Sequence, residues 1–235
     1  MIQHQLDTTE DGSPTLVTTY ENGVTERMHH FRGAMAESLY IYQPAITWSF
    51  QNVPGSHVMS LGLGLGYNEL ITAALALRAG LESKVWMTTY EIDQTLVAPF
   101  TAWLQGQEGL WRMAYQDIET RACQHFNLPQ VRETLNEWRS SGRWQVRAAF
   151  PDNLPCQDRY SAILYDAFSR KMDEHLWSQE FLTGFLAQNT TPSCALATYA
   201  ATGNLKRALK QNGFLVESKT GFGGKKESTF AIRQA

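Results

Sequence analysis

The sequence predicts an α/β fold: a mainly parallel seven-stranded sheet of the doubly wound type, preceded by a β-hairpin extension. Two observations favour this class. From residue 57 onward, short apolar segments alternate with helical segments, which is typical of parallel strands joined by helical crossovers. Near the C-terminus, two strand-like segments follow one another with no helix between them, which indicates an antiparallel pair at the sheet edge. A chain of 235 residues, 43% of them apolar, can bury one such core.

The first 33 residues predict β-hairpins. Asp11-Gly12 and Asn22-Gly23 are two-residue turn signals, and Thr-, Val- and Tyr-rich segments flank them. The expected N-terminal extension therefore consists of antiparallel strands.

A short helix is expected at residues 34–42, and Pro44 should end it because proline lacks the amide hydrogen that a helix interior needs. We place the β-hairpin extension at residues 1–50 and the main domain at residues 51–235.

The main domain should contain seven strands and at least four helices. The expected strands are residues 58–61, 85–90, 144–148, 160–165, 193–199, 214–218 and 228–232. The expected helices are residues 68–79, 94–104, 173–186 and 204–211. Residues 105–142 have a helical pattern with a break at Pro129. They are too long for one crossover, so we interpret them as an insertion with extra helices.

Several classes of protein are not expected. No run of about 18 apolar residues could span a membrane, and the N-terminus lacks the basic and apolar segments of a secretory signal. Cys123, Cys156 and Cys194 are too far apart in sequence to suggest a disulfide framework or a zinc site. The six histidines show no metal-ligand spacing. These features favour a cytoplasmic protein that binds no metal.

Charge is distributed unevenly along the chain. The net charge is −3, yet residues 203–235 contain seven basic and only two acidic residues. A basic end on an acidic chain indicates an anionic partner there. A solvated helix face followed by a charged hairpin would explain the same pattern.

A glycine-rich turn follows the first predicted strand of the main domain. Gly62, Gly64 and Gly66 would let backbone amides approach a ligand closely. The dinucleotide pattern G-x-G-x-x-G would need glycine at Tyr67. The spacing found here is instead typical of S-adenosylmethionine (SAM)-dependent methyltransferases. Glu91 ends the next predicted strand, where its two acceptor oxygens suit ribose hydroxyls.

Asp166 follows another predicted strand, and parallel-sheet enzymes place their chemistry at the carboxyl ends of strands. An amine nucleophile is protonated in neutral water, so it needs a proton acceptor, and Asp166 is the candidate. Phe168 could face a cationic methyl donor or the amine. The alternative is that Asp166 only caps the following turn.

Several segments resemble the methyltransferase domain of MnmC, the bifunctional tRNA 5-methylaminomethyl-2-thiouridine biosynthesis protein. Residues 62–68 are similar to that family's Gly-x-Gly-Thr-Gly-Leu-Asn turn, and residues 165–169 resemble its Asp-(Gly/Ala)-Phe-(Ala/Ser)-Pro segment. The best agreement lies in residues 197–203 and in residues 221–227, which read Gly-Phe-Gly-Gly-Lys-Lys-Glu. Residues 32–38 are similar to an N-terminal segment of stand-alone relatives.

The resemblance implies a Rossmann-like class I methyltransferase that uses SAM to methylate the aminomethyl nitrogen of wobble uridine 34 in certain tRNAs. This reaction converts 5-aminomethyl-2-thiouridine to 5-methylaminomethyl-2-thiouridine. The FAD-dependent oxidase of the bifunctional proteins would then be a separate protein that supplies the aminomethyl substrate. The implied donor-binding residues are Gly62, Gly64, Gly66, Asn68, Glu91, Asp166 and Phe168, with Asp166 also catalytic. The implied tRNA-binding residues are Phe222, Lys225 and Lys226.

Three positions depart from the family pattern. Ser60 stands where the family often has an acid, Ala148-Ala149 where it often has Gly-Asp, and Arg170 where it has proline. Two alternatives therefore remain. One is an aminopropyltransferase-like enzyme of polyamine synthesis, which would use decarboxylated SAM and an acidic acceptor site. The other is a methyltransferase-fold binding protein without catalysis.

Overall fold

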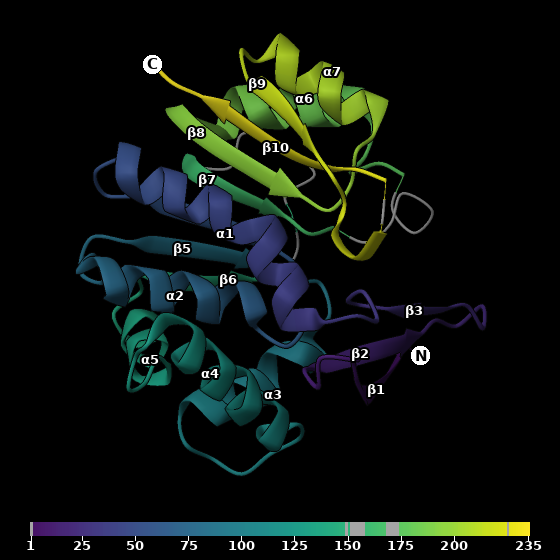
Figure 1. Ribbon diagram of the computed structural model, residues 1–235, viewed down its shortest axis with the longest axis vertical. Coiled ribbons are helices and arrows are strands. Elements are labelled where there is room, and N and C mark those ends of the chain that lie inside the picture. The colour runs from purple at the N-terminus through teal and green to yellow at the C-terminus, as the bar shows by residue number, and fades with distance from the viewer. Residues whose placement is uncertain (1, 149, 151–157, 168–173, 225) are drawn as a thin grey trace.

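Two β-sheets organise the chain in the computed structural model, which describes all residues except 1, 149, 151–157, 168–173 and 225. A three-stranded sheet has the order β1-β2-β3, and a seven-stranded sheet has the order β6-β5-β4-β7-β8-β10-β9 (Figure 1). The predicted fold class is confirmed, including the N-terminal hairpins and the antiparallel final pair.

The small sheet is formed by β1 (Gln3–Thr8), β2 (Pro14–Thr19) and β3 (Thr25–Arg27). Both predicted turn signals lie in the connections between these strands, with Gly12 at φ of 79° and Gly23 at φ of 77°. Thr8 pairs with Pro14 and Thr19 with Thr25, so each connection is longer than the two-residue turn that was predicted. The sheet is attached to the main domain through buried contacts. Leu16 is fully buried in the larger core, and the hydroxyl of Tyr67 donates a 2.6 Å hydrogen bond to the carbonyl of Pro14.

The large sheet is parallel except for its last two strands. The parallel strands are β4 (His57–Leu61), β5 (Trp86–Tyr90), β6 (Trp144–Arg147), β7 (Tyr160–Tyr165) and β8 (Thr190–Thr198). The antiparallel pair is β9 (Leu215–Lys219) and β10 (Ser228–Arg233). β10 inserts between β8 and β9, so β9 forms the edge of the sheet.

Helices cover both faces of this sheet because its central strands are apolar on both sides. Val58 and Leu164 point to one core, whereas Met59 and Tyr165 point to the other. The first core is covered by α1 (Ala34–Asn52), α2 (Tyr67–Ala79), α3 (Gln94–Leu104), α4 (Arg112–Phe126) and α5 (Arg132–Ser140). The second is covered by α6 (Gln179–Asn189) and α7 (Gly203–Gln211).

The prediction that Pro44 ends the first helix was wrong. α1 continues through Pro44 for 19 residues. The missing amide removes one helical hydrogen bond, but the helix buries Ile41, Ala45 and Ile46 against the sheet and α2. Tertiary packing therefore outweighs the local preference. α1 also crosses residue 50, where we placed the domain boundary, and that division stays a prediction.

The prediction of a helix at residues 173–186 was wrong at its start. Residue 173 lies outside the described part, and the helix α6 begins only at Gln179. Ser178 is the reason, because its side-chain oxygen accepts a hydrogen bond from the amide of Phe181 and caps the helix there.

Residues 105–142 contain the two helices α4 and α5, which pack on α2. The break expected at Pro129 lies between them. No helix in the described part of the chain is long and apolar enough to cross a membrane.

Candidate functional site

The glycine-rich turn between β4 and α2 has a backbone that favours glycine at three positions. Gly62, Gly64 and Gly66 have φ angles of 94°, 52° and 79°. Their surroundings differ. A Cβ on Gly66 would lie 2.2 Å from a ring carbon of Phe100, whereas a Cβ on Gly64 would lie 3.4 Å from the sulfur of Met28. Gly66 is therefore required by packing, and Gly64 leaves room beside the turn.

Replacing Gly66 with alanine should destabilise the protein. The positive φ and the clash with the Phe100 ring together should cost about 2–4 kcal/mol of unfolding free energy. Urea unfolding would measure the loss. Gly80→Ala is the matched control, because Gly80 has φ of 64° and no atom within 4 Å of its added Cβ. Equal losses in the two variants would contradict the packing role of Gly66.

Glu91 follows β5 and lies against this turn. One carboxylate oxygen accepts hydrogen bonds from the amides of Leu63, at 2.9 Å, and Gly64, at 3.4 Å. The other accepts from the amide of Asp93 at 2.8 Å. Burial raises the pKa of Glu91, although these three amides lower it. The carboxylate thus stabilises the conformation of the turn, and its oxygens can accept a hydrogen bond from one further donor.

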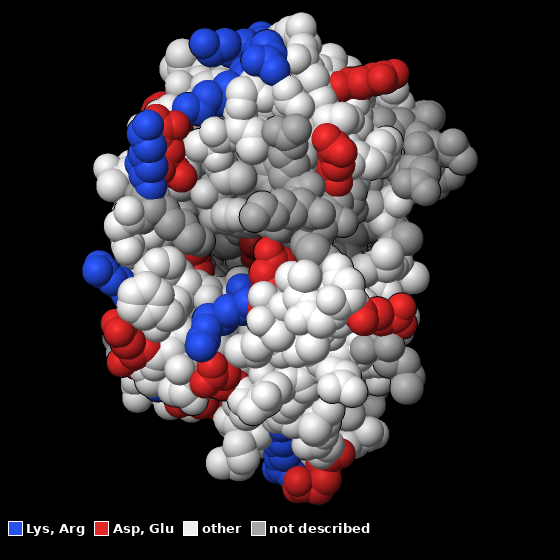
Figure 2. Space-filling model, turned by 90° about the vertical axis from the view of Figure 1, so that its right-hand side faces the viewer, with Lys and Arg blue, Asp and Glu red and all other residues white. Residues whose placement is uncertain are grey.

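A cavity of about 620 Å³ lies at the carboxyl ends of β4, β5 and β7. The N-terminal sheet and the start of α1 form its opposite wall. Of the residues predicted to bind the donor, the cavity is lined by Gly62, Gly64, Asn68, Glu91 and Asp166. Gly66 does not line it, and Phe168 lies outside the described residues. Figure 2 views this end of the molecule and shows a central hollow with acidic side chains beside it.

Sequence reasoning missed the N-terminal wall of the cavity. Its lining includes Thr18, Glu26, Arg27, Met28, His29, His30, Phe31, Glu37 and Tyr42. The only sequence signal was the resemblance of residues 32–38 to stand-alone relatives, and of that segment only Glu37 lines the cavity.

Asp166 also lines the cavity, and it lies beside two tyrosines, Tyr42 and Tyr199. Burial and the negative charge of Asp166 raise the pKa of both Tyr42 and Tyr199. The hydroxyl of Tyr199 donates a 2.8 Å hydrogen bond to the carbonyl of Ala167, which fixes the backbone next to Asp166. A proton acceptor and two hydroxyls are therefore gathered at one end of the cavity.

Ser60 and its neighbours form a buried polar group beneath the turn. The hydroxyl of Ser60 donates to the carbonyl of Gly62 at 3.2 Å. Glu69 is fully buried and accepts a 2.8 Å hydrogen bond from Thr89. The side-chain oxygen of Asn68 is buried and has no hydrogen-bond partner among the described residues, although Asn68 lines the cavity. It can therefore accept a hydrogen bond from a ligand.

The C-terminal hairpin approaches the same cavity from the side. Phe222 packs edge-on against His30, with ring centroids 5.7 Å apart, and also contacts Tyr40. His30 lines the cavity, so Phe222 lies next to its rim. Lys226 is exposed, and Lys225 lies outside the described residues. Of the predicted tRNA-binding residues that the structure describes, Phe222 therefore lies near the predicted donor site.

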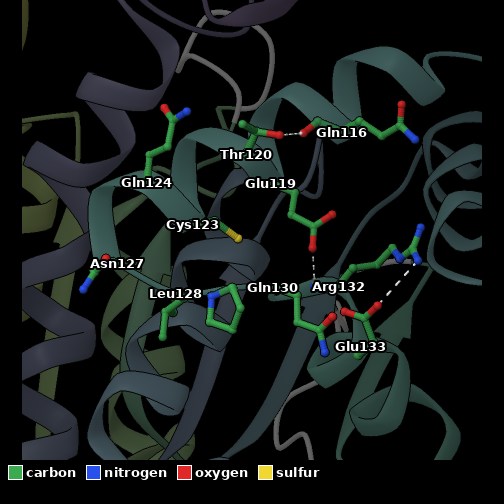
Figure 3. Close-up of a pocket in the computed structure, with 11 residues that line it drawn as sticks. Gln116, Glu119, Thr120, Cys123, Gln124, Asn127, Leu128, Gln130, Arg132 and Glu133 are labelled. Atoms are coloured by element: carbon green, nitrogen blue, oxygen red, sulfur yellow. Dashed lines mark hydrogen bonds and ion pairs between the residues drawn. The ribbon is translucent and has the colours of Figure 1, made fainter.

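A second hollow, of about 530 Å³, lies between α4 and α5 (Figure 3). Its Glu119 carboxylate accepts hydrogen bonds from the amides of Val131 and Arg132 and caps α5. None of the predicted site residues lines it. Within the described residues, no group of three or more His, Cys, Asp or Glu could hold a metal ion. The cavity at the strand ends is therefore the candidate site.

Known proteins are similar to this chain, and a family model matches the part that contains Asp166 and the C-terminal hairpin. A family model for S-adenosyl-L-methionine-dependent methyltransferases matches residues 143–234. The tRNA 5-methylaminomethyl-2-thiouridine biosynthesis bifunctional protein MnmC of Hahella chejuensis is 36% identical over 80 residues, which are 34% of this chain and 13% of that protein. The protein of the same name from Idiomarina loihiensis is 32% identical over 106 residues, which are 45% of this chain and 17% of that protein. Over part of its length, the chain therefore resembles a SAM-dependent methyltransferase domain of the MnmC type.

The fold of this chain is also found in a crystal structure of MNMC2 from Aquifex aeolicus. The two share a TM-score of 0.63 and 21% identity over 97% of this chain and 70% of that one. An uncharacterized protein of Methanocaldococcus jannaschii is 24% identical over 98% of this chain and 60% of its own length. This chain spans less than a fifth of the length of the two MnmC relatives it matches.

S-adenosyl-L-methionine is the cofactor of such a domain, and the residues of the cavity fit it. The cavity has room for a nucleoside with an amino-acid tail. Glu91 has acceptor oxygens of the kind that suit ribose hydroxyls, and the side-chain oxygen of Asn68 is a further acceptor of the kind that suits an ammonium group. The left-handed glycines keep side chains away from the turn.

Replacing Glu91 with alanine should weaken SAM binding by about 1.5–3 kcal/mol, the usual range for hydrogen bonds to a charged group. The variant also leaves the amides of Leu63 and Gly64 without their acceptor. Titration calorimetry would measure the loss, and Glu91→Gln, which keeps one acceptor oxygen, should lose less. Wild-type affinity in the alanine variant would refute Glu91 as the ribose-binding acid.

Proposed function

We propose that this chain methylates the aminomethyl nitrogen of wobble uridine 34 in certain tRNAs, with SAM as the methyl donor. The observation that carries the proposal is the position of Asp166, which shares one cavity with the glycine-rich turn and Glu91. The names of the MnmC relatives point to the same modification. A separate FAD-dependent oxidase would supply the aminomethyl substrate. Because the proposed substrate is tRNA, the proposal places the reaction in the cytoplasm.

In this proposal, one side of the cavity binds the methyl donor and the other side activates the substrate amine. Gly62, Gly64, Asn68 and Glu91 hold the donor, which supplies a methyl group that is already electrophilic. Asp166 accepts a proton from the substrate ammonium, so that the nitrogen lone pair is free to attack in line. We also propose Phe168 as a donor contact and residues 1–50 as an extension that completes the cavity. Residues 105–142 would be an insertion in the methyltransferase domain.

The C-terminal hairpin would bind the tRNA. Phe222 lies next to the rim of the cavity, where an aromatic ring can stack on a base. Lys225 and Lys226 would contact phosphates, which fix position rather than sequence. Figure 2 shows basic side chains on the same face as the hollow.

Replacing both Lys225 and Lys226 with alanine should weaken tRNA binding and flatten its salt dependence. The log–log slope should fall by about 0.7–0.9 for each phosphate that the variant no longer binds. SAM affinity should not change. Lys84→Ala is the control, because Lys84 is exposed near the amino end of β5. A salt slope equal to that of wild type in the double variant would make the hairpin an ordinary solvated surface.

Methyl transfer from labelled SAM to bulk tRNA tests the function itself. The tRNA should come from a strain that lacks the modification, and nucleoside analysis should identify the product. We expect label in 5-methylaminomethyl-2-thiouridine. Label in another nucleoside would change the substrate, and no label in any nucleoside would refute the tRNA proposal.

The acidic lining of the cavity favours one second candidate, an aminopropyl transfer to a polyamine. Glu26, Glu37, Glu91 and Asp166 all line it. Calorimetry with SAM and decarboxylated SAM separates the two functions. Preference for decarboxylated SAM would support the polyamine reaction, and binding of neither would indicate a methyltransferase fold without a donor.

A further inference from the structure

The N-terminal sheet contributes charge to the cavity as well as a wall. Glu26, on β3, faces the cavity from the position opposite Thr18 on β2. Burial raises the pKa of Tyr20 to about 12, and the negative charge of Glu26 and a hydrogen bond to its carboxylate contribute to this rise. Glu26 also acts on Tyr199, at the end of β8, together with Asp166 and Glu37. Carboxylates from both sheets and from α1 therefore surround one region of the cavity.

Positive groups in the described lining do not neutralise this region. The guanidinium of Arg27 is engaged by Asp7 at 2.7 Å. The other basic groups that face the cavity are the imidazoles of His29, His30 and His175. Glu37 accepts a 2.6 Å hydrogen bond from the amide of His30, which leaves its second oxygen to other contacts. The net charge of the lining is therefore negative at neutral pH.

Tyr42 adds a polar group beside these charges. Its side chain is only 3% exposed, and it lines the cavity close enough to Asp166 for that carboxylate to raise the pKa of its hydroxyl. Asp166 is the hydrogen-bond partner of this buried hydroxyl, so the phenol oxygen keeps lone pairs that can accept an N–H group. A primary ammonium group has three N–H donors. It could donate to the carboxylates of Glu26 and Asp166 and to this hydroxyl.

We infer that Glu26 and Tyr42 select the acceptor by binding its primary amine in the protonated form, next to Asp166. The inference rests on the proposed function and makes the N-terminal sheet part of the acceptor site. Glu26 attracts the cation, Tyr42 accepts one of its N–H groups, and Asp166 then takes the proton before methyl transfer. Glu26 would not increase the binding affinity of an uncharged acceptor of the same shape.

Two nucleosides that differ in charge test this inference. The probes are 5-aminomethyluridine and 5-hydroxymethyluridine, each titrated calorimetrically into protein saturated with S-adenosylhomocysteine. Wild type should prefer the amine. Glu26→Gln should bind the amine about tenfold to a hundredfold more weakly, the range expected for a hydrogen bond to a charged group. Its affinity for the hydroxymethyl nucleoside and for S-adenosylhomocysteine should not change.

Two further variants separate selection from folding. Glu10→Gln is the matched control, since Glu10 is exposed in the first turn of the same sheet and does not line the cavity. Tyr42→Phe keeps the buried ring and should raise KM for the acceptor more than it lowers kcat. It should also reduce the preference for the amine.

The outcomes distinguish this inference from the proposed function. Equal affinity of wild type for the two nucleosides, or no binding of either to a protein that methylates tRNA, would overturn the inference alone. An amine preference that Glu26→Gln abolishes, in a protein that does not methylate tRNA, would support the inference and refute the tRNA substrate.

Discussion

Replacing Asp166 with asparagine should lower kcat about 10²–10⁴-fold, the range for a lost general base, while SAM affinity stays close to that of wild type. Asparagine keeps the shape of the side chain but removes the charge and the proton acceptor. The glycine-rich turn is held by Glu91 rather than by Asp166, so the donor side should be preserved. Steady-state kinetics and calorimetry on the same preparation would measure both quantities.

The pH profile should change as well. An amine attacks only when it is deprotonated, so the wild-type rate should rise with pH through the pKa of the bound amine. Without a carboxylate to accept the proton, the rise in the Asp166→Asn variant should move to higher pH. Asp117→Asn is the control, because Asp117 pairs with Arg121 on α4 and does not line the cavity. Wild-type turnover with an unchanged profile would reduce Asp166 to a turn cap.

The unfolding free energy of the wild-type protein should fall as pH rises, and replacing Glu69 with glutamine should remove this fall. Glu69 is fully buried in α2, and burial raises its pKa to about 8 despite hydrogen bonds from Thr89 and Ser60. The ordinary value of 4.5 applies in the unfolded chain. Between these two pH values the folded state therefore holds a proton that the unfolded state has released.

Stability should consequently fall as pH rises from about 4.5 to about 8, by at most about 5 kcal/mol. Below this window both states are protonated, and above it both are ionised, so the loss is then complete. Glutamine does not titrate, so the unfolding free energy of Glu69→Gln should exceed that of wild type by a margin that grows across the window. Urea unfolding at several pH values would measure it.

Glu133→Gln is the control for this series, because Glu133 is exposed on α5. Its unfolding free energy should follow that of wild type at every pH. Parallel curves for wild type and Glu69→Gln would show that Glu69 is ionised in the folded protein, or that the unfolded state shifts its pKa equally.

The sequence by itself determined most of the fold, because its signals are local. Strand and helix periodicity located all seven strands of the large sheet, and paired turn residues located both hairpins. The glycine spacing and the two strand-terminal acids, Glu91 and Asp166, predicted one shared site. This prediction works because the carboxyl ends of parallel strands meet at one edge of a sheet.

Only the tertiary structure decided features that depend on distant neighbours. Pro44 remains inside α1 because the helix is buried against the sheet, and the role of Gly66 depends on the ring of Phe100, 34 positions along the chain. Glu26 and Tyr42 reach the cavity only because the N-terminal sheet and α1 both pack beside the strand ends. Periodicity reports which side of an element is apolar, but not which other element covers it. For that reason the acceptor side of the site could be seen only in three dimensions.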